Sequence, residues 1–230
     1  MAKRNKLQKF AEMLSFPNVF ENFNMKTPVL TGKDGEEVDF KGIWSEKHFN
    51  NNHPITLELA CGGGEYAVDL GKMFPERNFI GVDIKGARIW RGAKYALENN
   101  LSNVSFVRTR IEQIGLFFGP NEIDEIWITF PDPFLREGKA NKRLTSARFL
   151  NEYRKIIKPG GILHLKTDDP TLYEFTLETL QQDNQCVIHI ADENIYSKPF
   201  PIPELAIKTK YEGMNISGSN TIKWIKFSIH

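Results

Sequence analysis

The chain has 230 residues, 40% of them hydrophobic and 12% aromatic, and its 30 lysines and arginines nearly balance its 29 aspartates and glutamates. This composition is that of a folded globular protein and argues against intrinsic disorder. No apolar run approaches the length of a membrane-spanning helix, and residues 1–6 lack the apolar core of a signal peptide, so we expect a cytoplasmic protein without a membrane segment.

Residues 1–54 are predicted to form an N-terminal extension. Apolar residues at helical spacing indicate a short amphipathic helix over residues 3–15. Its basic residues are Lys3, Arg4, Lys6 and Lys9. Residues 17–54 are rich in Asn, Gly and Pro, have no sustained period, and contain one candidate strand at residues 38–40. The basic helix is interpreted either as a surface that contacts phosphates or as a solvated face.

From residue 55 onward, apolar strands alternate with helical segments. Strands are predicted at residues 55–60, 78–83, 104–107, 126–130, 162–165, 186–190 and 221–227. Helices are predicted at about residues 65–74, at 146–157 and at about 171–181, with a tight turn at 158–161. A further helix is predicted to run through Arg88 and to end near residues 99–100. This order predicts an α/β fold over 55–230, with a mostly parallel, doubly wound sheet. The last strand alternates in period two, which favours an antiparallel edge position.

A glycine turn follows the first of these strands. Gly62, Gly63 and Gly64 come directly after it, and Asp83 ends the second strand 21 residues after Gly62. Such a turn lets backbone approach a cofactor, and an acid at this spacing accepts hydrogen bonds from ribose hydroxyls. The pair predicts a site for a nucleoside-type cofactor. The alternative is a plain tight turn with an N-capping aspartate.

Glu58 lies two residues before the turn, inside an apolar strand, where an ionised carboxylate is costly unless it is paired or serves a ligand. A cationic ligand such as S-adenosylmethionine would pair with it, whereas Glu58 and Glu65 would repel the pyrophosphate of a dinucleotide. Residues 62–67 nevertheless also match the G-x-G-x-x-G/A pattern, so an NAD-dependent dehydrogenase stays open. An outward-facing carboxylate is the alternative for Glu58.

The loop after the fourth strand holds Asp132 between two prolines, Pro131 and Pro133. The fixed φ angles of proline, and the restriction on the residue before each one, leave Asp132 little conformational freedom. That suits a positioned active-site group, and a purely structural turn is the alternative.

Four ordered motifs resemble those of the bacterial tRNA (guanine-N7)-methyltransferases. The segment Phe130-Pro131-Asp132-Pro133-Phe134 and the following basic residues Arg136, Lys139 and Lys142-Arg143-Leu144-Thr145 are similar to the F-P-D-P-W segment and the K-R-R-L run of that family. Lys166-Thr167-Asp168 resembles its K-T-D, and Thr209-Lys210-Tyr211-Glu212 its T-x-Y-E. The resemblance covers residues from about 57 to the end. It implies a Rossmann-like class I methyltransferase that uses S-adenosylmethionine to methylate N7 of a guanine in the variable loop of tRNA.

The resemblance also implies roles by position. Glu58 and Asp83, beside the turn residues Gly62 and Gly64, match the cofactor-binding acids, and Asp132 matches the active-site aspartate next to the cofactor. The positions that match substrate-binding residues are Arg136, Asp168, Thr209, Lys210, Tyr211 and Glu212.

The chain departs from the family pattern at three places, one of which is Glu137-Gly138, which thins the usual basic run. Arg110 stands where the family usually has an aspartate near the adenine, and Glu112 follows two residues later. Glu112 or a backbone amide is expected to substitute, so Arg110 and Glu112 are both candidate cofactor-binding positions. Phe134 replaces a tryptophan in the same apolar role.

Guanine N7 carries an in-plane lone pair and no proton, so its attack on a sulfonium methyl is a direct in-line displacement that needs no general base. The expected task of the protein is orientation and electrostatic support. Asp132 and Asp168 are expected to hold the guanine edge through its N–H donors.

The near-neutral total charge conceals two basic segments. Residues 1–10 carry +4 and residues 136–158 carry +6, which leaves −9 on the other 197 residues. This distribution predicts tRNA binding that weakens steeply as salt rises.

Other chemistries are weaker. The five histidines, His48, His53, His164, His189 and His230, show no metal-ligand spacing, and two cysteines, Cys61 and Cys186, cannot form a four-cysteine zinc site, so we expect no metal. Cys61 is interpreted as a small residue in the turn. Three alternative functions stay open. They are a methyltransferase that acts on a small molecule or a protein, a dehydrogenase, and a non-catalytic RNA-binding module, which Arg110 leaves open. A monomer or a homodimer is expected.

Overall fold

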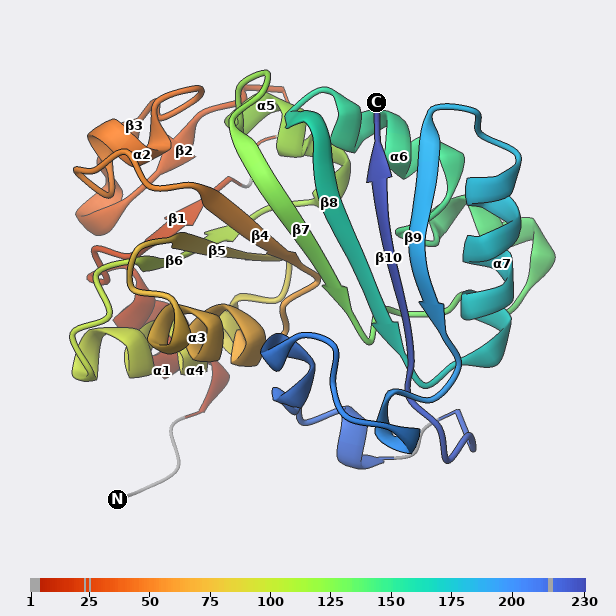
Figure 1. Cartoon of the computed structure of the whole chain (residues 1–230). Coiled ribbons are helices and arrows are strands. Elements are labelled where there is room, and N and C mark those ends of the chain that lie inside the picture. The colour runs from red at the N-terminus through yellow and green to blue at the C-terminus, as the bar shows by residue number, and fades with distance from the viewer. Residues whose placement is uncertain (1–4, 23, 25, 215–216) are drawn as a thin grey trace. The chain divides into compact units, whose positions relative to one another are not determined.

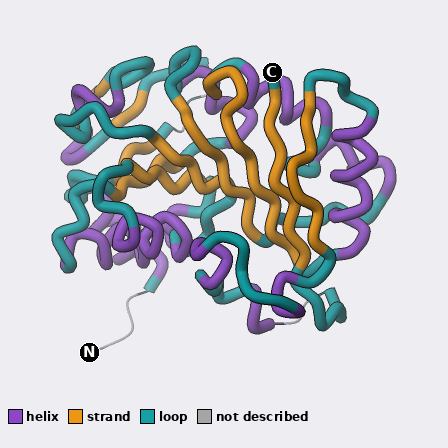
Figure 2. Tube along the Cα trace, viewed as in Figure 1, coloured by secondary structure: helices purple, strands orange, loops and turns teal. Residues whose placement is uncertain are grey.

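The computed structural model describes residues 5–22, 24, 26–214 and 217–230 (Figure 1). The chain divides into two compact units, with the boundary between Gly119 and Pro120, and each unit is described by itself. Helices, strands and loops are distinguished in Figure 2. In the described residues, no helix combines the length and hydrophobicity that crossing a membrane requires.

The first unit contains six strands and five α-helices among its described residues. They are α1 (Lys6–Met13), β1 (Val19–Glu21), β2 (Leu30–Thr31), β3 (Glu37–Val38), α2 (Trp44–Lys47), β4 (Ile55–Leu59), α3 (Glu65–Met73), β5 (Asn78–Asp83), α4 (Gly86–Glu98), β6 (Val104–Arg108) and α5 (Ile114–Phe117). The strand order is β3-β2-β1-β6-β5-β4. The four strands β1, β6, β5 and β4 run parallel, and β2 and β3 are antiparallel additions.

The core of this unit surrounds the parallel strands. Every residue of β4 and β5 is buried, as expected for parallel strands that are covered on both faces. The helices α3 and α4 pack on β5 and β6. Trp44 of α2 is fully buried and stacks on Phe118, with ring centroids 5.5 Å apart.

The second unit has four strands and two α-helices in its described part. They are β7 (Ile123–Thr129), α6 (Ala147–Arg154), β8 (Ile157–Thr167), α7 (Pro170–Gln181), β9 (Cys186–Asp192) and β10 (Lys223–Ile229). The strand order is β7-β8-β10-β9, with β7 parallel to β8 and β10 antiparallel to both of its neighbours. Asp169 starts α7 by accepting a 2.7 Å hydrogen bond from the Leu172 N–H, and Pro170 occupies the first turn, where no N–H partner is needed.

The predicted alternation of strands and helices from residue 55 is confirmed, with β5 matching its predicted range of 78–83. The N-terminal helix covers residues 6–13, whereas Lys3 and Arg4 lie outside the described residues. Residues 19–21, which show no sequence period, form β1 and pair in parallel with β6. The separation of an extension at 1–54 from a methyltransferase domain at 55–230 remains a prediction.

The predicted edge position of the last strand is wrong, although its antiparallel direction is confirmed. β10 lies between β8 and β9, and β9 occupies the edge. The alternating lysines suggested an exposed face, but Lys223 is 7% exposed. Burial is tolerated because the ammonium donates to the hydroxyls of Thr221 at 2.9 Å and Ser219 at 3.1 Å.

The turn predicted at residues 158–161 is absorbed into β8. Opposite β7, the register passes from Ile123 beside Ile157 to Glu125 beside Ile162, so β8 carries three extra residues as a bulge. Gly160 has φ +73 within it. Residues 158–161 therefore form a bulge within one strand, and they do not mark a boundary between two elements.

Candidate functional site

The glycine turn of the first unit requires left-handed backbone. The φ angles are +56 at Ala60, +56 at Gly62 and +73 at Gly64, a region that favours glycine. The Gly64 N–H closes the turn onto the Cys61 carbonyl at 2.8 Å. A Cβ at Gly64 would lie 2.4 Å from the ring of Phe106 in β6, so sterics also demand glycine here.

Phe106 connects the turn to the rest of the unit. A Cβ at Gly81 in β5 or at Gly92 in α4 would also meet this ring, at 2.7 and 2.8 Å. A Cβ at Gly92 would lie only 2.5 Å from the carbonyl oxygen of Gly63. Glycines in the turn, in β5 and in α4 thus make room for one aromatic ring. Sequence reasoning missed this cluster, because isolated glycines in a strand and a helix carry no signal of which ring they face.

Asp83 organises the turn at the end of β5. It is 7% exposed, and its Oδ2 accepts the Gly62 N–H at 2.9 Å while its Oδ1 accepts the Lys85 N–H at 2.8 Å. One carboxylate therefore orients both the glycine turn and the start of α4. A carboxylate has about four acceptor positions, so these two bonds leave capacity for ribose hydroxyls.

Glu58 points into the protein, which excludes the outward-facing alternative. Its side chain in β4 is 2% exposed, and its Oε2 accepts the Ala67 N–H in the first turn of α3 at 2.9 Å. The N-terminus of a helix favours negative charge, which lowers the cost of this burial. Burial and the charges of Glu58, Asp83 and Glu65 hold the pKa of the Cys61 thiol well above its usual value. Cys61 thus stays a protonated thiol, which fits its interpretation as a small residue of the turn.

These residues fit a cationic nucleoside. The turn lies among the carboxylates of Glu58, Asp83 and Glu65, and Glu65 is partly neutralised by Arg91, whose Nη1 lies 3.4 Å away. This negative surrounding suits a sulfonium and disfavours a pyrophosphate. Arg110 and Glu112 are both exposed beyond the end of β6, where Arg110 precedes a 3-10 turn at Ile111–Gln113. Their contact with the adenine stays a prediction.

The proline loop of the second unit, residues 130–134, has a strained backbone and is held in place by Arg143. We call these contacts of Arg143 the Arg143 clamp. Phe130 and Phe134 have φ +47 and +43, which costs about 1–3 kcal/mol per residue and is typical of functional sites. Arg143, which is 5% exposed, donates to the carbonyls of Pro133 at 2.9 Å and Phe134 at 3.2 Å. Its guanidinium lies 4.3 Å from the ring centroid of Phe175. Asp132 is exposed within this clamped loop.

Half of the cations in the basic run at residues 136–158 are buried or paired with acids. Arg143 is buried, Arg154 lies 2.7 Å from Asp183, and Lys155 and Lys158 pair with Glu152 and Asp124. Four cations of the run are exposed, with no acidic partner in the described residues. They are Arg136, Lys139, Lys142 and Arg148.

The two C-terminal motifs meet within the second unit. Lys166 and Glu212 form an ion pair, with 2.8 Å between Nζ and Oε2. The Oδ2 of Asp168 accepts the Ser217 N–H at 3.3 Å, and the hydroxyl of Thr209 accepts the Glu212 N–H at 3.3 Å. Sequence spacing could not predict the ion pair, because 46 residues separate its partners.

The remaining predicted positions differ in exposure. Lys210 and Arg136 are exposed and Tyr211 is half-buried. Among the described residues, no group of three or more His, Cys, Asp or Glu side chains is arranged to hold a metal ion.

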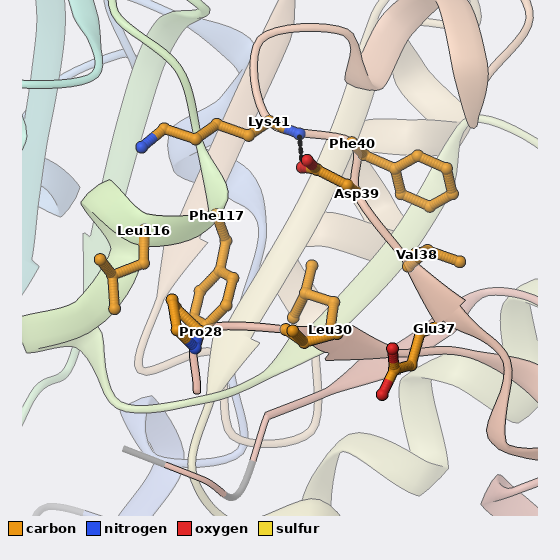
Figure 3. A pocket seen from close by; sticks show the side chains of 10 residues that line it. Pro28, Leu30, Glu37, Val38, Asp39, Phe40, Lys41, Leu116 and Phe117 are labelled. Atoms are coloured by element: carbon orange, nitrogen blue, oxygen red, sulfur yellow. Dashed lines mark hydrogen bonds between the residues drawn. The ribbon is translucent and has the colours of Figure 1, made fainter. Parts of the chain in front are cut away.

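The first unit contains a cavity of about 470 Å³ (Figure 3). Its apolar lining comes from the β2–β3 region and from α5. The lining includes Pro28, Leu30, Val38, Phe40, Leu116 and Phe117. None of the predicted site residues lines it, so the cofactor assignment does not depend on this cavity.

Comparison with known structures defines the class of the fold. A 16S rRNA methyltransferase, KamB, matches with a TM-score of 0.59 and 12% identity, over 84% of this chain and 96% of that chain. An S-adenosylmethionine-dependent methyltransferase from Aquifex aeolicus matches with a TM-score of 0.54 and 15% identity, over 80% and 87%. The family model described as "Putative methyltransferase" matches residues 52–224. The fold is the Rossmann-like one of class I methyltransferases, which confirms the predicted fold class.

Sequence relatives then specify the family. The tRNA (guanine-N(7)-)-methyltransferase of Bacteroides thetaiotaomicron is 46% identical over 98% of this chain and 86% of its own length. That of Christiangramia forsetii is 43% identical over the full length of both chains. The chain belongs to the tRNA (guanine-N7)-methyltransferase family, and the resemblance carried by the four motifs is confirmed.

Proposed function

We propose that this protein transfers a methyl group from S-adenosylmethionine to N7 of a guanine in the variable loop of tRNA. The observation that carries the proposal is the glycine turn, held by Asp83 beside the buried Glu58, in a chain of this family. We also propose that the protein works in the cytoplasm, without a metal, as a monomer or a homodimer.

Glu58, Asp83 and the backbone of Gly62 and Gly64 would hold the cofactor. Asp83 would accept the ribose hydroxyls with the acceptor capacity that its two backbone bonds leave, and Glu58 would supply negative charge near the cationic end. When bound, S-adenosylmethionine supplies an electrophilic methyl group on a sulfonium. Binding by preorganised groups reduces the entropic cost of alignment.

Asp132 and Asp168 would hold the guanine edge by accepting its N–H groups and would offset the positive charge that develops on the ring. The Arg143 clamp supports this role for Asp132, because it fixes the loop before the substrate arrives. No group has to remove a proton, since N7 carries none.

A loop guanine fits better than a guanine in a regular helix. In A-form RNA, N7 faces a deep, narrow major groove that side chains cannot read. The exposed cations Arg136, Lys139, Lys142 and Arg148 would contact phosphates. Lys6 of α1 is a further exposed candidate, whereas Lys9 is half-buried, with its ammonium 4.7 Å from the Trp90 ring centroid. We expect binding to weaken with salt by a slope of about −0.7 to −0.9 per phosphate contact.

A thermal-shift experiment separates this proposal from the dehydrogenase reading. We expect S-adenosylmethionine to raise the melting temperature and NAD to leave it unchanged, because the carboxylates around the turn repel a pyrophosphate. Stabilisation by NAD alone would contradict the cofactor assignment.

Substitution of Asp132 tests the active-site assignment. We expect Asp132→Asn to lower the rate of methyl transfer to an unmodified tRNA transcript roughly a hundredfold, the usual effect of losing one electrostatic group at a reacting centre. Glu178→Gln, which neutralises an exposed carboxylate on α7, is the matched control and should keep its activity. Full turnover by Asp132→Asn would exclude the role. Cofactor and tRNA binding by the unaltered protein without any transfer would favour the non-catalytic module.

A further inference from the structure

Lys166, the first residue of the Lys166-Thr167-Asp168 motif, is a buried cation without a predicted role. Its side chain in β8 is 0% exposed. The ammonium donates to the carbonyl oxygens of Leu205 at 3.1 Å and Ile207 at 2.8 Å, and it lies 2.8 Å from Oε2 of Glu212. Three oxygen atoms from one segment of chain, residues 205–212, thus surround a single ammonium.

This segment has no strand ladder to hold it. Its described secondary structure consists of 3-10 turns at Pro203–Ala206 and Glu212–Met214. Besides the backbone hydrogen bonds of these turns, such a segment needs side chains or water to pair its remaining backbone polar groups. Lys166 binds two of its carbonyls, and the hydroxyl of Tyr196 donates to the other carboxylate oxygen of Glu212.

Burying the charged ammonium of Lys166 within a strand costs free energy. Burial holds its pKa below the usual value, and the charge of Glu212 offsets that effect in part. An apolar side chain of similar volume is often neutral or stabilising where a buried ion pair is replaced, so stability alone does not explain a cation here. The carboxylate of Glu212 also has both oxygens engaged, one by Lys166 and one by Tyr196.

We propose that Lys166 is a positioning residue for the RNA substrate, acting through Glu212 and through the carbonyls of Leu205 and Ile207. It fixes residues 209–211 in one conformation, next to the strand end that carries Asp168. In this arrangement Glu212 anchors the segment through its contacts with Lys166 and Tyr196. The inference rests on the proposed function, because Asp168 and residues 209–212 are substrate positions only if tRNA is the substrate.

The test is steady-state kinetics of Lys166→Met, which keeps the length of the side chain and removes its donors. We expect the KM for tRNA to rise at least tenfold, while the Kd for S-adenosylmethionine changes less than twofold. Adding Glu212→Gln to Lys166→Met should recover part of the loss, because Gln leaves no unpaired buried charge. Tyr196→Phe should raise the KM for tRNA a few fold.

Asp183→Asn is the matched control. It weakens another partly buried ion pair of the second unit, with Arg154 at 2.7 Å, and touches none of the predicted substrate positions. It should lower the melting temperature without changing the KM for tRNA. If Lys166→Met behaves in the same way, Lys166 is merely structural and the inference is wrong.

Three further outcomes are decisive. If Lys166→Met does not fold, Glu212→Gln and Tyr196→Phe carry the test, and an unchanged KM for tRNA in both would overturn the inference. If the unaltered protein binds S-adenosylmethionine but transfers no methyl to tRNA, the proposed function fails and the inference falls with it. Normal transfer by the unaltered protein with an unchanged KM in the variants overturns the inference alone.

Discussion

The two units hold their predicted site loops with opposite charges. In the first unit, the buried anions Glu58 and Asp83 accept hydrogen bonds from backbone N–H groups. In the second unit, the buried cations Arg143 and Lys166 donate to backbone carbonyls. A turn that enters a helix leaves N–H groups without helical partners, which suit anions, and the loops of the second unit present the carbonyls that Arg143 and Lys166 bind.

The backbone groups that pair with these charges therefore explain why the charges are buried, before any ligand is considered. Each of these four charges is matched by backbone dipoles, and this reduces the cost of its burial. Substitutions that remove these buried charges should therefore have separable effects, on the proposed cofactor turn in the first unit and on the proposed substrate loops in the second.

The largest effect is expected for Gly64→Ala in the first unit. The substitution combines a φ of +73 with a Cβ 2.4 Å from Phe106, so we expect it to lower the free energy of unfolding by roughly 3 kcal/mol or more. Gly138→Ala is the control, since its Cβ would meet nothing within 4 Å, and it should stay within about 0.5 kcal/mol. Chemical denaturation measures both. Equal values would show that the turn tolerates a side chain.

Acid titration is expected to have the next largest effect, through His48. Burial lowers its pKa to about 4, and its Nε2 lies 2.5 Å from the Ser105 hydroxyl. Between an unfolded pKa near 6.5 and this value, the unfolded state binds more protons, so stability falls as pH falls, by up to about 3 kcal/mol. Unfolding by denaturant at pH 7 and at pH 4.5 should show this loss, and His48→Gln should reduce it. An identical loss in the variant would contradict the assignment.

His164 is a buried histidine of the second unit. Burial lowers its pKa too, but Glu125, whose Oε1 lies 2.9 Å from its Nε2, opposes the effect. We therefore expect His164→Gln to remove less of the loss of stability between pH 7 and pH 4.5 than His48→Gln does.

Arg143→Met tests the cationic clamp. It leaves two loop carbonyls without their donors and removes the contact with Phe175, so we expect a loss of about 2 kcal/mol in unfolding free energy and a lower kcat. Arg148→Met removes an exposed cation of α6 and should change stability by less than about 0.5 kcal/mol. If both variants lose tRNA affinity equally and keep kcat, Arg143 is only one more cation of the basic run.

The smallest of these effects is expected for Asp83→Asn. An amide offers one carbonyl oxygen where the carboxylate uses two, so one backbone bond is lost, and we expect the Kd for S-adenosylmethionine to rise about tenfold, or about 1.4 kcal/mol. Asp69→Asn, which affects an exposed pair with Lys72 on α3, is the control. Titration calorimetry that gives the same Kd for both variants would remove Asp83 from the cofactor site.

The contrast also explains what the sequence could predict. The acids of the first unit act over short separations, 21 residues from Asp83 to Gly62 and nine from Glu58 to Ala67, so strand, turn and spacing were enough to find them. The Lys166–Glu212 pair spans 46 residues and depends on how the chain folds back after β9. The sequence placed Arg143 in a basic run, because nothing local reveals that a cation is buried. β1 was missed because three residues are too few to show a period.

Mapping the methylated nucleoside tests the proposed function. The protein is incubated with unmodified tRNA and labelled S-adenosylmethionine, the RNA is digested, and the labelled nucleoside is identified and mapped. We predict label at N7 of a guanine in the variable loop. Label on another atom or base, or no transfer although the cofactor binds, would contradict the account.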